Sequence, residues 1–383
     1  MTINAVVRVL ALAGLLLCTD RSHAQAPAFH GFDMMVPVAP APVRVGDASQ
    51  LAYELHLTNF ARDSLTLTRV QVLSDADGST LAVFEGSALE GLVGLAGRLS
   101  AGANLRVVDA GGRSILYFNL ADEAAVRARR LRHRIDYEVV VNGAREPRWV
   151  EGGATTVDRA ALPVLGPPLR GGPWAGIYAP EMERGHRRVL YAVDGRARIP
   201  GRFAIDWFGV DAQGRFTRSG SDTLTDYIGY GAEVLAVADG VVVAARDDVA
   251  EPATTANPPR VSLADATGNY VALDIGGGRF AFYEHLRPGL RVRAGDRVRK
   301  GEVIGAVGFT GSASMPHLHF HVSDANAPLA AEGHPYQLTG FRTVGAYPSI
   351  DAFGRGEAWR PVTASAGSVP ALPSPNTVVE FTP

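Results

Sequence analysis

Three histidines alternate with apolar residues near the C-terminal end of the sequence: His317, His319 and His321. Side chains two residues apart on a β-strand point to the same face of a sheet. If this segment is a strand, the three imidazoles line one face. Imidazole is the commonest protein ligand of catalytic divalent metals. The segment is therefore a candidate half of a metal site, and the other half must come from elsewhere in the chain.

Two residues far from this segment could contribute to the same site. His285 lies at the end of an expected strand, within residues 280–286. Asp206 has apolar neighbours on both sides, and a buried carboxylate is costly unless it is paired or bound to a metal. Asp206 could also be an ordinary structural aspartate, but its presence beside a histidine cluster favours a role in the site.

Length and composition indicate an ordinary globular protein. The chain has 383 residues, of which 46% are hydrophobic and 20% are charged, enough for two domains with separate cores. The formal net charge of −2 gives no sign of a nucleic-acid-binding protein.

The N-terminal residues 1–24 resemble a secretory signal peptide. Arg8 precedes an apolar stretch at residues 9–17, and small residues suitable for cleavage follow at 22–26. The only cysteine, Cys18, lies in this segment, so disulfides and thiolate metal ligands are excluded after cleavage. No later stretch reaches the roughly 20 apolar residues that a membrane span needs. We expect a secreted or periplasmic protein without stable membrane insertion after signal cleavage.

The fold class expected from the patterning is all-β. Residues 25–160 should form a β-sandwich (Ig-like) domain, because residues 51–58, 65–73 and 135–141 alternate apolar and polar side chains and Asn142-Gly143 is a hairpin turn signal. Residues 123–134 are the one plausible helix, or a charged loop.

The rest of the chain divides by composition. Residues 161–175 are rich in proline and glycine and are expected to be a linker. Residues 176–350 should form a second all-β domain, and residues 351–383 a flexible tail. The strand-like runs of the second domain are residues 234–237, 240–245, 270–274, 280–283 and 303–307.

Several motifs in the second domain resemble those of the lysostaphin/LytM-type zinc metallopeptidases, family M23, which cut peptidoglycan peptides. They occur in the same order as in that family, over roughly residues 186–325, whereas the first 160 residues share nothing recognisable with it. The motifs are Thr310-Gly311 through Pro316-His317-Leu318-His319-Phe320, Tyr283-Glu284-His285-Leu286, and residues 236–242, 268–271 and 290–308.

The resemblance implies an M23-type antiparallel β-sheet peptidase domain with zinc as cofactor. Asp206 and His319 would be metal ligands. His285 and His317 would flank the metal-bound water, where one helps to take its proton and either could stabilise the oxyanion. The implied activity is that of a secreted zinc-dependent endopeptidase acting on peptidoglycan peptides, which would lie in a groove walled by residues 227–230 and by a loop at 248–260.

One position departs from the family pattern. The family usually has a histidine four residues before the aspartate, and here that residue is Arg202, which stays protonated and cannot bind a cation. His186 could supply the third ligand by folding back beside Asp206, and a resemblance to relatives with a similar His-Arg-Arg segment favours it. It could equally be a surface histidine. His321 is one pleat, roughly 6.6 Å, further along the strand, which favours a hydrogen-bonded or core-facing role.

A second function stays open at this point. Degenerate LytM-like domains lack metal ligands and serve to bind the wall or to activate another hydrolase, and Arg202 fits that alternative. However, a purely binding domain has no physical need for His285, His317, His319 and Asp206 together. The sequence therefore favours the enzyme.

Overall fold

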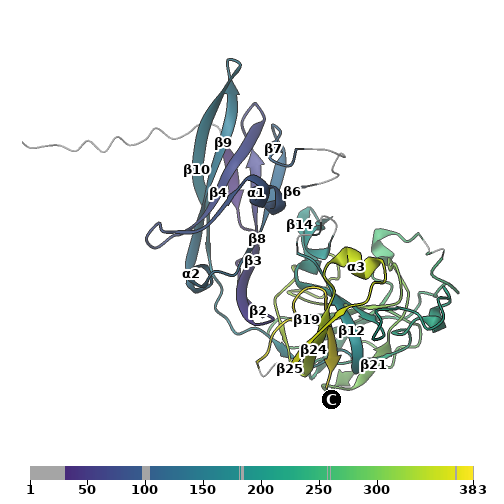
Figure 1. The fold of residues 1–383 in the computed structure, drawn as a ribbon. Coiled ribbons are helices and arrows are strands. Elements are labelled where there is room, and N and C mark those ends of the chain that lie inside the picture. Colours follow the sequence, from purple (N-terminus) through teal and green to yellow (C-terminus); the bar gives the residue numbers. More distant parts are fainter. Residues whose placement is uncertain are drawn as a thin grey trace, which may run out of the picture.

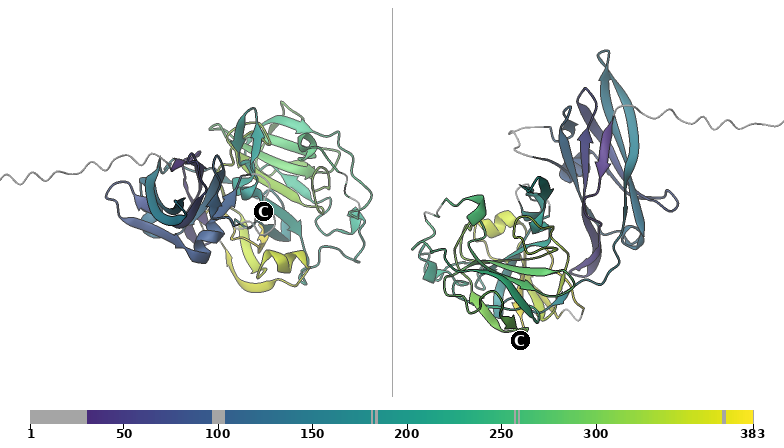
Figure 2. Two further views of the ribbon diagram at one scale, coloured as in Figure 1. Left: turned by 90° about the horizontal axis from the view of Figure 1, so that it is seen from above. Right: turned by 180° about the vertical axis from the view of Figure 1, so that it is seen from behind.

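The computed structural model describes residues 31–96, 104–180, 182, 185–256, 258, 260–366 and 369–382. The segment expected to be a signal peptide, 1–24, lies outside the described residues. The chain is mostly β-sheet, as the sequence predicts. Figure 1 shows the N-terminal strands, in purple to blue, as an elongated body beside a second body in teal to yellow. Figure 2 shows the two bodies from above and from behind.

Two antiparallel five-stranded sheets form the N-terminal body. The first consists of β1 (Phe32–Met35), β3 (Ala48–Asn59), β8 (Arg113–Leu120) and β6 (Val93–Leu95) in that order, with β2 (Pro42–Val45) also paired to β3. The second consists of β10 (Ala144–Thr156), β9 (Arg130–Val141), β4 (Leu65–Ser74) and β5 (Thr80–Glu85), with β7 (Val107–Val108) paired to β4. Side chains of both sheets share one hydrophobic core, so this body is a β-sandwich.

The three N-terminal strands expected from alternation are β3, β4 and β9. Each is present and slightly longer than the apolar pattern. The turn at Asn142-Gly143 joins β9 to β10, and its φ angles of 50° and 81° are those of the hairpin turn that this pair favours.

The helix expected at residues 123–134 is mostly wrong. Only α2 (Glu123–Arg127) is helical, started by the Asp122 side chain, which accepts hydrogen bonds from two backbone amides. From Arg130 the chain is β9, because alternate residues from Leu131 onward are buried in the sandwich core. The short helix α1 (Gly86–Leu92) has no counterpart among the expected elements.

The second body is built on one antiparallel ten-stranded sheet. Its strands, in spatial order, are β20 (Arg297–Val298), β17 (Gly240–Arg246), β18 (Asn269–Asp274), β19 (Phe280–Leu286), β22 (Leu318–Ser323), β15 (Ile205–Gly209), β12 (Gly171–Ile177), β26 (Thr377–Phe381), β24 (Phe341–Ala346) and β25 (Arg360–Ala366). Strands that lie far apart in the sequence are thus neighbours. This order brings the 206 and 319 regions together at the middle of the sheet.

Short elements surround this sheet. Three two-stranded pairs are β16 (Glu233–Leu235) with β21 (Val303–Ala306), β13 (Tyr191–Val193) with β14 (Arg196–Arg198), and β11 (Val164–Leu165) with β23 (Gln337–Leu338). The helical turns are η1 (His186–Arg188), η2 (Pro200–Phe203), η3 (Leu224–Asp226), η4 (Leu263–Asp265) and α3 (Ile350–Gly354). Within the described part of the chain, no helix has the length and apolar character needed to cross a membrane.

Two segments expected to lie outside the domains are part of the fold. The proline- and glycine-rich stretch 161–175 contains β11 and the start of β12. Residues 351–383, expected to be a flexible tail, supply β25 and β26. Val378, Val379 and Phe381 of β26 are buried, and their burial holds this strand in the sheet. The overall composition of the segment does not reveal these residues.

A buried histidine makes the sandwich sensitive to acid. The His133 ring accepts from the Tyr53 hydroxyl at 2.8 Å and donates to the Gly153 carbonyl at 3.1 Å. Burial lowers the pKa of His133 from 6.5 to about 4. Between these values the unfolded chain binds more protons than the folded chain, so stability is lost as the pH falls through this window.

We therefore expect the thermal unfolding midpoint to decrease as the pH falls from 6.5 to 4. His133 should account for a loss of at most about 3 kcal/mol in the free energy of unfolding. His133→Gln keeps a donor and an acceptor but does not titrate. It should flatten this decrease in a calorimetric pH series. Equal pH slopes for the two proteins would contradict the prediction.

Candidate metal centre

The centre of the site is a carboxylate and an imidazole on adjacent strands. Asp206 on β15 lies directly opposite His319 on β22 in the sheet register. On the other side of β22, His319 faces Glu284 on β19. Directly opposed residues in an antiparallel pair project from the same face. The strand order therefore gathers Asp206, His319 and Glu284 in a row across three strands.

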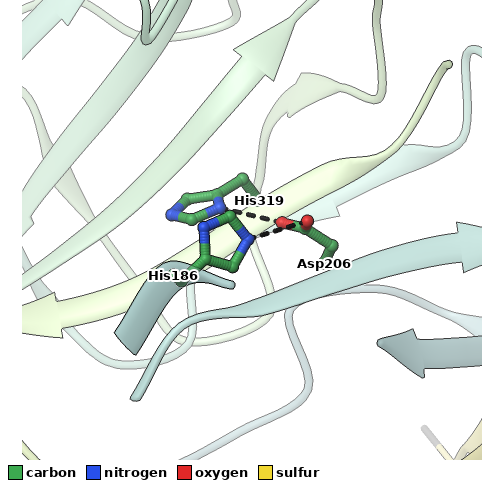
Figure 3. Close-up of side chains that lie close together, drawn as sticks. All are labelled: His186, Asp206 and His319. Carbon is green, nitrogen blue, oxygen red and sulfur yellow. Dashed lines mark hydrogen bonds and ion pairs between the residues drawn. The ribbon is translucent and has the colours of Figure 1, made fainter. Parts of the chain in front are cut away.

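His186 reaches this row from outside the sheet. It opens the helical turn η1, and its Nε2 lies 2.8 Å from Asp206 Oδ2. His319 Nδ1 lies 2.8 Å from the other carboxylate oxygen, Oδ1. Figure 3 shows the two imidazoles converging on the carboxylate from different elements. One ligand atom from each of the three residues lies within 4.8 Å of the other two.

His317 and His285 lie on one side of this group. His317 Nε2 is 3.5 Å from Asp206 Oδ1, and its ring is 4.8 Å from that of His285. The Nδ1 atoms of His317 and His285 donate to the backbone carbonyls of Met315 and Thr310, at 2.8 and 2.9 Å. These bonds assign the proton to Nδ1 in both rings, so Nε2 is the basic nitrogen of each.

A backbone irregularity brings His285 to the same site as Glu284. Consecutive residues of a regular strand point to opposite faces. His285 has a φ of 64°, which non-glycine residues seldom adopt. This conformation breaks the alternation at the end of β19, so the imidazole stands beside His317 and His319. Such departures concentrate at functional sites.

His321 and Glu284 support His319 from behind. His321 Nδ1 lies 3.1 Å from His319 Nε2, and Glu284 Oε1 lies 3.9 Å from the same His321 atom. Glu284, His319 and His321 also have ligand atoms within 4.8 Å of one another. The hydrogen-bonded role expected for His321 agrees with this geometry. Glu284 was not singled out from the sequence, although its apolar neighbours and its place before His285 were a usable signal.

Burial and local charge set the protonation of these groups. Burial alone would raise the pKa of Asp206, but His186 and His317 hold it well below its usual range, so the carboxylate is ionised. Burial would lower the pKa of His186, but Asp206 raises it. Burial lowers the pKa values of His319 and His285, which favours the neutral imidazoles that bind metals or accept protons. Burial raises the pKa of Glu284 to about 8.

The site opens into a cavity of about 410 Å³, within the ~300–1,000 Å³ range of ligand-binding cavities. Its walls differ from those expected. Of the residues that the structure describes, none in 227–230 or 248–260 lines it; Tyr227 and Tyr230 instead hydrogen-bond the loop through Thr255 and Glu251. The lining besides the site residues comes from Val189, Tyr191, Pro200, Gly201, Val261, Ser262, Leu263, Ala266, Thr267, Ser312, Pro328 and Leu329.

The donor set fits a catalytic zinc ion. Catalytic zinc sites use three protein ligands of nitrogen and carboxylate-oxygen type and keep another position open. His186, Asp206 and His319 are such a set. Arg202, which stands where the family pattern has a histidine, points away to Glu54 and Glu332 and leaves the set intact.

Comparison with known proteins gives a family for part of the chain. Residues 224–331 match the model of the family described as Peptidase family M23. This stretch contains His285, His317 and His319, while Asp206 and His186 precede it.

Several solved structures are similar to the chain at low identity. The catalytic domain of the prophage-encoded M23 protein EnpA from Enterococcus faecalis, studied as a point mutant, is 17% identical over 44% of this chain and 92% of its own, with a TM-score of 0.26. The catalytic domain of lysostaphin from Staphylococcus simulans is 21% identical over 43% and 88%, with a TM-score of 0.24. A zinc-containing peptidase from Vibrio cholerae is 15% identical over 74% and 80%, with a TM-score of 0.25. At these TM-scores the likenesses carry no argument about activity.

Proposed function

We propose that this chain is a zinc-dependent endopeptidase that hydrolyses peptide bonds in cell-wall peptidoglycan, and the match of residues 224–331 to peptidase family M23 supports this proposal. The observation that carries the proposal is the convergence of His186, Asp206 and His319 from three separate elements. Three imidazoles surround Asp206, with nitrogen atoms 2.8, 2.8 and 3.5 Å from its carboxylate oxygens.

In this proposal His186, Asp206 and His319 hold the zinc ion. Bound zinc supplies Lewis-acid polarisation of a carbonyl and acidifies water. His285 and His317 offer unprotonated Nε2 atoms whose orientation is fixed by the bonds from Nδ1 to backbone carbonyls. One of them would accept the proton of the attacking water, and the Nε2–H that forms would then donate to the carbonyl oxygen on which negative charge develops. His321, whose Nδ1 lies 3.1 Å from His319 Nε2, keeps His319 in place, and Glu284 lies beside that same His321 atom.

The substrate and the compartment follow from the family and the signal-like segment. The match to family M23 supports peptidoglycan peptides as the substrate. A secreted or periplasmic location would give the protein access to them. An extended peptide would enter the cavity beside His285 and His319, between η4 and residues 328–329. The N-terminal signal-like residues supply the export that this location requires.

Metal analysis and digestion of purified wall material test the proposal together. We expect about one zinc ion per chain after dialysis. We also expect new amino ends to appear when the protein is incubated with purified peptidoglycan. A zinc chelator should stop their appearance, and added zinc should restore it.

The rival function predicts a different pattern. A non-catalytic LytM-like domain would sediment with wall fragments, contain no metal and release no amino ends. Zinc-loaded protein that binds peptidoglycan without producing amino ends would also contradict the peptidase function.

A further inference from the structure

We propose that the N-terminal β-sandwich is a working part of the metal centre: Glu54 of β3 positions the ligand His186 by joining Arg187 and Arg202 across the boundary between the two bodies. Glu54 is a positioning residue and touches neither metal nor substrate. The inference rests on the proposed function in one respect, namely that His186 binds the metal.

The first step is the ion triad itself. Glu54 Oε1 accepts from Arg187 Nε at 2.9 Å, and Glu54 Oε2 accepts from Arg202 Nε at 2.8 Å. The side chains of all three residues are at most 5% exposed. Buried charges of this kind persist only when they are paired and hydrogen-bonded, so the triad strongly constrains both arginines.

The second step is that the sandwich satisfies most of the Arg187 guanidinium. Besides Glu54, this group donates to the Asn119 side chain at 2.6 Å and to the carbonyls of Tyr53 and Phe118 at 3.0 and 2.7 Å. These acceptors lie on β3 and β8 of one sheet. Arg187 of the second body is therefore bonded to two adjacent inner strands of a sheet of the first body.

The third step connects the triad to the ligand. Arg187 directly follows His186 in η1, and Arg202 lies in η2. The two turns pack so closely that a Cβ atom added to Gly201 would lie 2.8 Å from His186 Cβ. Glu54 holds one residue of each turn. The backbone of His186 is thus fixed between a neighbour bound to the sandwich and a glycine that permits close contact.

The boundary also contains apolar and aromatic contacts on both sides of the triad. Ile115 and Tyr117 of β8 form a buried cluster with Ile199, and the Arg188 guanidinium lies 4.8 Å from the Tyr117 ring centroid. At the other end Val43 of β2 belongs to the core of the second body. Contacts between the two bodies therefore flank the triad beside His186.

This arrangement gives Arg202 a role. An arginine cannot bind a cation, but its guanidinium can form ion pairs with carboxylates on other segments and so connect those segments. Arg202 also donates to Glu332 at 2.9 Å and to the Gly333 carbonyl at 2.9 Å. The residue connects the sandwich, η2 and the 332–333 loop, while His186 supplies the nitrogen donor beside Asp206.

The test compares zinc affinity, by chelator competition, in the full chain with Glu54→Gln. We expect a loss of about 10–100-fold, the usual effect of removing a group that orients a metal ligand. Glu138→Gln, which removes a carboxylate from the Arg145 ion pair on the other sheet, is the matched control and should keep the original affinity. Asn119→Ala removes one bond to Arg187 from an exposed position and should give a smaller loss, which keeps the test usable if Glu54→Gln fails to fold.

A double-mutant comparison separates positioning from general destabilisation. In a His186→Ala background, Glu54→Gln should cause no further loss of zinc affinity, because its effect passes through His186. Full affinity in Glu54→Gln and in Asn119→Ala, with a loss in His186→Ala, would overturn this inference and leave the proposed function standing. Full affinity in His186→Ala would instead overturn the assignment of that ligand. Equal losses from Glu54→Gln with and without His186 would also contradict positioning.

Discussion

His319→Ala is expected to abolish both zinc binding and peptidoglycan hydrolysis. His319 contacts Asp206 through Nδ1 and His321 through Nε2, so its loss removes one proposed ligand and disconnects the support behind it. A catalytic metal contributes several kcal/mol of transition-state stabilisation, and each 1.36 kcal/mol is tenfold in rate. We expect kcat/KM to fall by about a thousandfold or more.

The measurement pairs metal content per chain with the rate of appearance of amino ends. His334→Ala is the control, because His334 is a half-buried histidine of the same body that bonds the Pro335 carbonyl and belongs to neither ligand group. It should keep zinc and activity. Hydrolysis at the original rate by metal-free His319→Ala would refute the metal mechanism.

His186→Ala should lose zinc almost as completely as His319→Ala, because His186 is the only one of the three proposed ligands that comes from outside the sheet. Its Nε2 lies 2.8 Å from Asp206 Oδ2, and no other described histidine is placed to replace it on that side of the carboxylate. We expect at least about a hundredfold weaker zinc binding, the loss of one full ligand exceeding the ~10–100-fold effect of a supporting group.

The comparison variant is His321→Ala, which removes a partner of His319 but none of the atoms around Asp206. It should retain zinc with a smaller loss. The reverse order, with zinc lost in His321→Ala and retained in His186→Ala, would assign the metal to the neighbouring group of Glu284, His319 and His321.

Local pattern was sufficient to predict several strands and the histidine face. The alternation at 51–58 and at 65–73 specifies β3 and β4, and the pair Asn142-Gly143 specifies its hairpin, because these signals depend only on neighbouring residues. The same holds for the histidine row on β22. The placement of His186 beside Asp206 agrees with the preferred alternative, although that preference came from a family resemblance.

The order of strands in the large sheet could not be predicted in this way. Neighbouring positions of β15 and β22 are set by tertiary packing, and periodicity carries no information on which distant strands pair. For that reason Glu284 was not recognised as a neighbour of His319. Glu54 was hidden for the same reason: an isolated glutamate in an alternating strand gives no sign of arginines more than a hundred residues away.

Apolar anchors within polar segments were the other source of error. Residues 351–383 have the composition of a tail, yet three buried side chains in β26 are enough to fix a strand. The segment 123–134 was expected to be a helix or a charged loop, but the alternating buried residues of β9 decided the conformation from Arg130 onward.

The position of β26 has a practical consequence for shortened forms of the protein. This strand is hydrogen-bonded to β12, and β12 is bonded to the strand that bears Asp206. A fragment that stops before Thr377 would expose the backbone of β12 as an open edge, which invites pairing with another copy. A truncation that removes β26 would therefore damage the sheet two strands from the metal centre and favour aggregation.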